Sequence, residues 1–249
     1  QSHVELVADH LQWYRAAGWK SFLPDRDAVE RRTLSEAAGR EKTRLESWLV
    51  KERRKPPGNS FPDLFRGHVL EAAMSTVTTR LVADIAQCHV LEIGSGDLLH
   101  RFMELGLPPG QASGIDPAPY GLVRSTAAAD IRPVQAHPDD LPFPDRTFDL
   151  VVAVGYFMHV LDRHLQELIG NELRRVAKED GIILTVDLTP GNELRLPPYY
   201  AYTTAGIDID DLERIFPDSG IDYEPLTDYS VAVIRSRPPV GKECLPDGV

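Results

Sequence analysis

The sequence predicts an α/β fold, with a doubly wound, mostly parallel sheet that ends in an antiparallel hairpin. From His89 onward, short apolar runs alternate with longer amphipathic stretches, which is typical of a parallel sheet with helices on both faces. Near the C-terminal end, two strand-like runs follow each other without a helix between them, which predicts the hairpin. A charged, helix-like part precedes the sheet.

The N-terminal part is expected to be a helical extension. Apolar residues recur at helical spacing over about the first 55 residues, and the Pro- and Gly-rich segment Lys55–Ser60 ends that pattern. We therefore expect a helical extension or lid over residues 1–60 and a main domain over residues 61–249. A further helix is expected over Phe65–Ala86.

Four short apolar runs bounded by turn residues are expected to be buried strands. They are Val90–Ile93, Ala112–Asp116, Phe148–Val154 and Gly181–Asp187. The helical stretches between them are Leu98–Leu105, Tyr120–Ala128 and Leu165–Ala177. A short helix and the two strands of the hairpin follow at Asp208–Phe216, Asp222–Pro225 and Ser230–Arg235. We expect the hairpin at an edge of the sheet.

The composition is that of a folded, acidic protein. Among 249 residues, 27 Lys and Arg against 38 Asp and Glu give a net charge of −11, which disfavours a nucleic-acid partner because phosphate backbones attract clustered cations. No apolar run has the length of a membrane span. Cys88 and Cys244 are expected to be reduced thiols, and no secretory signal is expected, so the predicted location is cytoplasmic.

The loop after the first predicted strand carries two glycines, Gly94 and Gly96, around Ser95. Glycines there let a ligand approach the backbone, and the next helix offers free N–H groups. Asp116, at the end of the next strand, can accept hydrogen bonds from both ribose hydroxyls of a nucleoside. Glu92 would repel a phosphate but suits an amine or a sulfonium cation. These residues predict a nucleoside cofactor without a pyrophosphate.

The loop and several later segments together resemble the class I S-adenosylmethionine-dependent methyltransferases, of the type 11-like, small-molecule kind. The segments that carry this resemblance are Leu91–Gly96, Gly114–Asp116, Asp139–Asp145, Thr147–Val152, Met158–Asp162 and Asn171–Gly181. They occur in the family's order and spacing across residues 88–237, and no resemblance covers residues 1–87. The resemblance implies a Rossmann-like fold with seven strands and an enzyme that converts S-adenosyl-L-methionine to S-adenosyl-L-homocysteine.

The resemblance also implies a set of cofactor-binding residues. They are Glu92, Gly94, Ser95, Gly96, Asp116, Pro117, His137, Pro138, Asp139, Val154 and Gly155. Two departures from the family pattern stand out. Leu98 occupies the place of a frequent third glycine. His137 replaces the acid that binds the adenine amino group, and Pro138 after it has no N–H to offer, which leaves Asp139 as a substitute.

The segment after the third predicted strand should contain the catalytic residues, because ligands bind at the carboxyl ends of parallel strands. His159 is the candidate base, since imidazole titrates near neutrality, and the alternative is a histidine that caps or packs against the following helix. Tyr156 is the second catalytic candidate and could line the cofactor pocket. The Pro- and Tyr-rich loop from Thr189 to Tyr202 and the aromatic residues of the N-terminal extension are candidate substrate walls or lids.

The predicted function is methyl transfer from S-adenosylmethionine to an oxygen or nitrogen of a small-molecule metabolite, such as a natural-product intermediate, in biosynthesis. The alternative is a protein of the same fold that only binds the cofactor, or uses it for another reaction such as a cyclisation. A protein methyltransferase is a third interpretation. No metal site is expected, because no His and carboxylate cluster has ligand spacing. A homodimer is compatible with the sequence.

Overall fold

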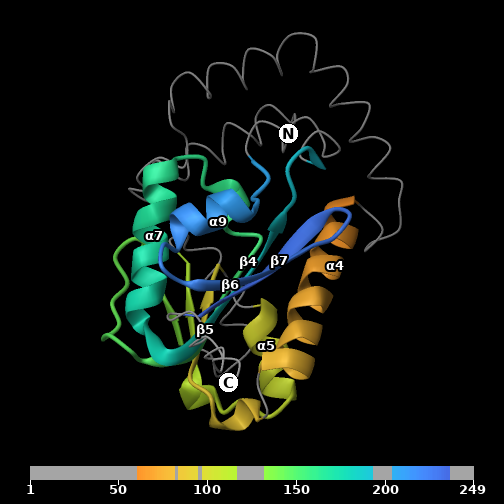
Figure 1. The fold of residues 1–249 in the computed structure, drawn as a ribbon. Coiled ribbons are helices and arrows are strands. Elements are labelled where there is room, and N and C mark those ends of the chain that lie inside the picture. The colour runs from red at the N-terminus through yellow and green to blue at the C-terminus, as the bar shows by residue number, and fades with distance from the viewer. Residues whose placement is uncertain (1–60, 82–83, 95–96, 117–131, 193–203, 236–249) are drawn as a thin grey trace, which may run out of the picture.

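The structure, a computed structural model, describes residues 61–81, 84–94, 97–116, 132–192 and 204–235. They form a seven-stranded sheet in the order β3-β2-β1-β4-β5-β7-β6 (Figure 1). The strands are β1 (Val90–Ile93), β2 (Ala112–Ile115), β3 (Arg132–Val134), β4 (Phe148–Val154), β5 (Ala177–Leu188), β6 (Gly220–Pro225) and β7 (Tyr229–Arg235). The strands β1 to β5 pair in parallel, and β7 pairs antiparallel with both β5 and β6. The predicted fold class and edge hairpin are therefore confirmed.

Helices cover both faces of the sheet, as a doubly wound fold requires (Figure 1). The helices α4 (Phe61–Thr76) and α5 (Asp97–Glu104) contribute apolar side chains to one core, together with Leu184 and Val186 of β5. The helices α7 (Arg163–Val176) and α9 (Ile209–Ile215) contribute to a second core on the opposite face, together with Ile183. Alternate residues of β5 thus face different cores, which explains the continuous apolar run in the sequence.

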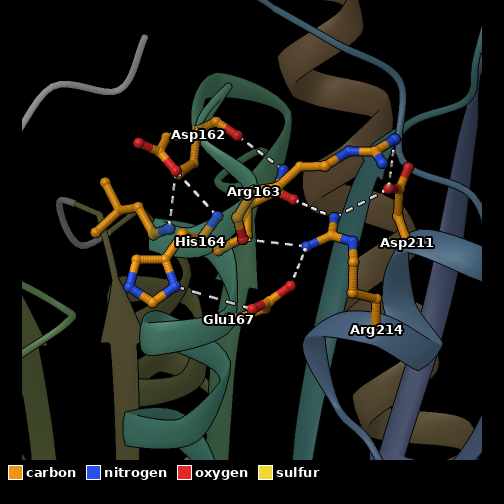
Figure 2. Close-up of polar contacts among 9 residues, drawn as sticks. Asp162, Arg163, His164, Glu167, Asp211 and Arg214 are labelled. Atoms are coloured by element: carbon orange, nitrogen blue, oxygen red, sulfur yellow. Dashed lines mark hydrogen bonds and ion pairs between the residues drawn. The ribbon is translucent and has the colours of Figure 1, made fainter. Parts of the chain in front are cut away.

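The two helices on the second face pack closely because α7 carries a glycine at their contact. A Cβ atom built on Gly170 would lie 2.4 Å from the backbone oxygen of Ile215, so a larger residue would push the helices apart. Figure 2 shows the polar contacts between the same two helices, where the Arg214 guanidinium reaches Glu167 and the backbone oxygen of Arg163. Close backbone contact and this charged contact together fix α9 on α7.

Several predicted elements differ from the observed ones. The helix expected over Phe65–Ala86 is α4, which continues as the π-helical turn η1 (Val77–Leu81), and a separate 3₁₀ turn follows at η2 (Ile85–Gln87). The strand β3 was not predicted, because it has only three residues and Pro133 in its centre. The helix expected over Tyr120–Ala128 and the extension over residues 1–60 lie outside the described residues. Within the described part of the chain, no helix combines the length and apolar character needed to cross a membrane.

Candidate functional site

The candidate site lies where the parallel strands end. The pairing places Ile93 beside Ile115, and Ile115 beside Val134, so the segments after β1, β2 and β3 leave the sheet at one edge. The backbone N–H of Gly94 donates to the oxygen of Ile115 at 2.9 Å, and the N–H of Asp116 donates to the oxygen of Val134 at 3.2 Å. The predicted glycine loop and the predicted ribose acid are therefore neighbours.

Gly94 has a left-handed backbone conformation, with a φ of +90°, which explains why a glycine stands there. A Cβ atom at this position would lie 3.5 Å from the ring atom Cδ2 of Tyr156. Tyr156 follows β4, so the structure brings one predicted catalytic residue against the predicted cofactor loop. Ser95, Gly96 and Pro117, also predicted to bind the cofactor, lie outside the described residues.

Glu92 closes the beginning of α5. Its buried carboxylate accepts hydrogen bonds from the backbone N–H groups of Leu98, at 3.2 Å, and Leu99, at 3.1 Å. The sequence predicts that the first N–H groups of this helix are free for a ligand, and for the N–H groups of Leu98 and Leu99 this prediction is wrong. A carboxylate at a helix N-terminus satisfies the amides and occupies the place where a phosphate would bind. Leu98, the residue in place of a third glycine, is fully buried in the core with α4.

The residues predicted to bind the adenine form a short turn after β3. They are His137, Pro138 and Asp139. The N–H of Asp140 donates to the backbone oxygen of His137 at 3.0 Å, and these two residues form an isolated antiparallel bridge. Pro138 is buried, whereas His137 and Asp139 are half-buried. The turn thus places all three predicted residues after β3, which pairs with β2, the strand that Asp116 follows.

A charged network that the sequence analysis did not identify holds the loop after this turn. The Arg175 guanidinium donates to both carboxylate oxygens of Glu172, and also to the backbone oxygens of Leu141 and Phe143. Glu172 in turn accepts the N–H of Leu141 at 2.8 Å, and the hydrogen bond from Arg175 is the main cause that lowers the pKa of Glu172. α7 therefore anchors the loop that leads from the adenine-side turn into β4.

The turn after β4 carries the predicted catalytic residues. Gly155 has a φ of +63°, and its N–H donates to Val186 of β5 at 2.7 Å, which turns the chain sharply after Val154. The 3₁₀ turn η4 (Phe157–His159) follows. Tyr156 packs edge-on against Phe157, with the ring centroids 6.2 Å apart. The turn therefore places Tyr156 and His159 at the edge of the sheet that also holds Gly94 and Asp116.

His159 lies at the end of η4 and is half-buried. Its backbone N–H donates to the oxygen of Tyr156 at 3.1 Å. The residue that caps α7 is Asp162, whose carboxylate accepts the N–H groups of His164 and Leu165 (Figure 2). His159 therefore does not cap this helix, and its role as a base stays a prediction.

Asp187, at the carboxyl end of β5, is a site residue that the sequence analysis missed. Its side chain is 1% exposed, and its Oδ1 accepts the N–H of Met158 in η4 at 3.0 Å. Burial raises the pKa of Asp187 to about 7, and the N–H groups of Met158, Phe157 and Tyr156 partly oppose this rise. The available signal was an acid as the last residue of a predicted buried strand.

The buried acids share one edge of the sheet. Among the described residues, the buried Asp and Glu side chains are Glu92, Asp116 and Asp187, at the ends of β1, β2 and β5, and no Lys or Arg is buried. Such an edge favours hydroxyl donors and cations over phosphate. No group of metal-ligating side chains occurs in the described part of the chain. The lid candidates, the Tyr-rich residues 193–203 and the N-terminal aromatics, lie outside that part.

Comparisons with known proteins show which sequences this chain is similar to. Residues 91–185 match a family model described as a methyltransferase domain. The ubiquinone/menaquinone biosynthesis C-methyltransferase UbiE of Pseudomonas putida is 32% identical over 151 residues, which cover 55% of this chain and 58% of the relative. The UbiE protein of Stutzerimonas stutzeri (strain A1501) is 32% identical over 118 residues, 44% of this chain and 45% of the relative. The chain spans about half the length of the curated relatives it matches.

Solved structures share the fold. A protein from Pyrococcus horikoshii OT3 aligns with a TM-score of 0.54 and 16% identity, over 75% of this chain and 98% of that chain. A protein described as a SAM-dependent methyltransferase from Methanosarcina mazei aligns with a TM-score of 0.52 and 15% identity, over 65% and 97%. At these identities the likeness concerns the fold alone.

Proposed function

We propose that this chain, whose residues 91–185 match a family model described as a methyltransferase domain, is a class I S-adenosylmethionine-dependent methyltransferase that transfers a methyl group to a small-molecule metabolite. The observation that carries the proposal is the placement of Asp116 beside Gly94, next to a helix whose first amides already bind Glu92. Among the described residues, this edge offers a carboxylate for ribose hydroxyls, and the Leu98 and Leu99 amides at the start of α5 already bind Glu92. A nucleoside with a cationic tail suits it better than a dinucleotide.

Each of the proposed cofactor-binding residues would contact a different part of the cofactor. The Asp116 carboxylate would accept the ribose hydroxyls, and Gly94 would let the backbone approach the amino acid part. The turn from His137 to Asp139 would border the adenine ring. Pro138 has no N–H, so a polar contact with the adenine must come from its neighbours. Glu92 supports the site indirectly, because it fixes the start of α5 beside the glycine loop.

When bound, S-adenosylmethionine supplies a methyl group already activated by its sulfonium. The protein then has to align the acceptor with that methyl group and exclude water. The turn after β4 suits this task, since Tyr156 packs against the cofactor loop and His159 stands three residues further along. For an acceptor of high pKa we propose that His159 takes the proton, and that Tyr156 orients the acceptor.

The net charge and the relatives both bear on the class of acceptor. The net charge of −11 disfavours nucleic acid, and we propose an oxygen or nitrogen of a biosynthetic intermediate as the acceptor. The relatives named UbiE are described as C-methyltransferases of ubiquinone and menaquinone biosynthesis, so a carbon acceptor should be tested as well. A protein that binds the cofactor without methyl transfer stays the alternative, motivated by His137 and Pro138.

Calorimetry with S-adenosylmethionine and S-adenosylhomocysteine tests the cofactor part. The wild-type protein should bind both, and Asp116→Ala should weaken binding by about 1–3 kcal/mol, because two hydrogen bonds to a charged acceptor are lost. Asp180→Ala is the matched control, since Asp180 is an exposed acid in the first part of β5. An unchanged affinity of the Asp116 variant would place the ribose elsewhere.

A transfer assay tests the reaction. Methyl-labelled S-adenosylmethionine is incubated with a panel of phenols, amines and quinols, and labelled product is measured. Transfer to one class, lost in His159→Ala at unchanged cofactor affinity, supports methyl transfer with His159 as the base. Tight cofactor binding without transfer to any class would favour the alternative of a binding protein or another reaction.

A further inference from the structure

We propose that Asp187 is a positioning residue for the methyl transfer: from the end of β5 it caps the turn η4 and thereby holds Tyr156 and His159 at the cofactor loop. This inference rests on the proposed function, and it assigns a role to an acid that the cofactor does not need. It concerns the acceptor side of the site, whereas Asp116 and Glu92 belong to the cofactor side.

The turn η4 begins without a cap of its own. Tyr156 is the N-cap residue by position, but its side chain makes no capping hydrogen bond. Asp187 supplies the acceptor from another strand, because its Oδ1 accepts the N–H of Met158 at 3.0 Å. The backbone N–H groups of Phe157 and Tyr156 also lower the pKa of this carboxylate. The Asp187 side chain therefore satisfies the Met158 amide in the first part of the turn, as a capping residue does in a helix.

This capping acid stands in an environment that disfavours a charge. Asp187 is 1% exposed, and its Oδ2 has no hydrogen-bond partner among the described residues. Burial raises the pKa of Asp187, and the backbone amides of η4 partly oppose that rise. A buried polar group with an unsatisfied oxygen costs free energy, so its presence calls for a local reason. The cap on η4 is the reason that we propose.

Other contacts hold the opposite side of the turn. The N–H of Ala205 donates to the backbone oxygen of Met158 at 2.8 Å, and the Gln166 amide donates to the oxygen of Val160 at 2.7 Å. Gln166 is itself fixed by Arg214 of α9, at 2.6 Å. These bonds hold carbonyl groups, whereas Asp187 holds N–H groups. Removal of Asp187 should therefore loosen the first residues of the turn and leave its end in place.

Tyr156 transmits the effect to the reaction. Its ring lies against Gly94, so a rotation of the Tyr156 backbone would move the ring relative to the cofactor loop. An error of about 1 Å in the alignment of reacting groups can cost about a hundredfold in rate. Cofactor affinity depends mainly on Asp116 and the glycine loop. Loss of the cap should thus reduce turnover far more than it reduces affinity.

Three variants separate this role from a general loss of stability. Asp187→Ala removes the acceptor, and Asp187→Asn keeps an oxygen that can accept the Met158 N–H. If the alanine variant does not fold, Asp187→Val removes the acceptor with a smaller cavity. Thr185→Val is the matched control, because Thr185 is equally buried two residues earlier on the same face of β5 and pairs with Ala153 and Ala232.

Hydrogen exchange, read by mass spectrometry on a peptide over residues 155–160, tests the cap without any acceptor. We expect exchange there to become at least about tenfold faster in Asp187→Ala, to stay near wild type in Asp187→Asn and Thr185→Val, and to stay unchanged in β1 and α5. Unchanged exchange at 155–160 in the alanine variant would overturn the inference. So would an equal acceleration throughout the sheet.

Turnover and affinity complete the test. With the best acceptor of the panel, kcat of Asp187→Ala should fall about tenfold or more while its Kd for S-adenosylmethionine changes less than about threefold, and Asp187→Asn should recover most of the rate. Equal losses of kcat in the asparagine and alanine variants would contradict positioning by the oxygen acceptor. If the wild-type protein transfers no methyl group, the proposed function fails, and the exchange measurement still decides whether Asp187 caps the turn.

Discussion

At the carboxyl edge of the sheet, side-chain carboxylates have three different roles. Glu92 satisfies the Leu98 and Leu99 amides of α5, and Asp187 satisfies the Met158 amide of η4. Asp116 follows β2 beside the glycine loop, and we assign it to the ribose. The type of residue alone does not separate these roles, because each depends on which backbone N–H groups the fold brings within reach of the carboxylate.

The pH dependence of stability provides a test at the scale of one residue. Burial raises the pKa of Asp187 from an ordinary 3.8 to about 7, so between these values the folded protein holds a proton that the unfolded chain has released. The stabilising contribution of this group is therefore complete below about pH 4 and is lost as the pH rises through about 7.

We expect the free energy of unfolding of the wild type, relative to Asp187→Asn, to fall between about pH 4 and pH 7, with a slope approaching 1.4 kcal/mol per pH unit, and to be constant above about pH 8. Urea unfolding of both proteins across this range measures the difference, and Thr185→Val should keep the wild-type slope. Parallel pH profiles of wild type and Asp187→Asn would show that Asp187 is not a buried acid with a raised pKa.

At the scale of elements, the packing of α7 on α9 requires a glycine. A Cβ atom on Gly170 would lie 2.4 Å from Ile215 O, whereas one on Gly67 in α4 would meet no atom within 4 Å. The same substitution should therefore have opposite effects at these two helical positions.

We expect Gly170→Ala to lower the free energy of unfolding by about 1–3 kcal/mol, because the helices must separate. Gly67→Ala should raise it by about 0.5–1 kcal/mol through the better helix propensity of alanine. Urea unfolding of the two variants checks both signs. A Gly170 variant as stable as the wild type would contradict the close contact of α7 and α9.

The sequence predicted the elements whose pattern is local and missed those that depend on distant partners. The strands β1 and β4 have the predicted bounds, since continuous apolar runs between turn residues mark them clearly. The strand β3 escaped prediction because three residues with a central proline carry no periodic signal, and it forms only by pairing with β2. Asp187 escaped for a similar reason: its role exists only because the sheet order brings β5 beside β4 and its turn.

For the whole molecule, the sheet order explains how residues from four separate segments come together at the candidate site. Parallel strands bring the segments after β1, β2, β3 and β4 to one edge of the sheet. The acids at that edge are part of a chain whose net charge is −11. The order and spacing of the motifs in the sequence predict this arrangement. The acceptor was not predictable, because the candidate walls around it carry no motif that identifies a metabolite.

A crystal structure of the protein with S-adenosylhomocysteine tests the central claim most directly. We expect the nucleoside at the ends of β1 and β2, with both ribose hydroxyls within hydrogen-bond distance of the Asp116 carboxylate and the amino acid part over Gly94. A nucleoside bound away from Asp116, or one whose ribose is held by other side chains while Asp116 binds only protein groups, would contradict the account.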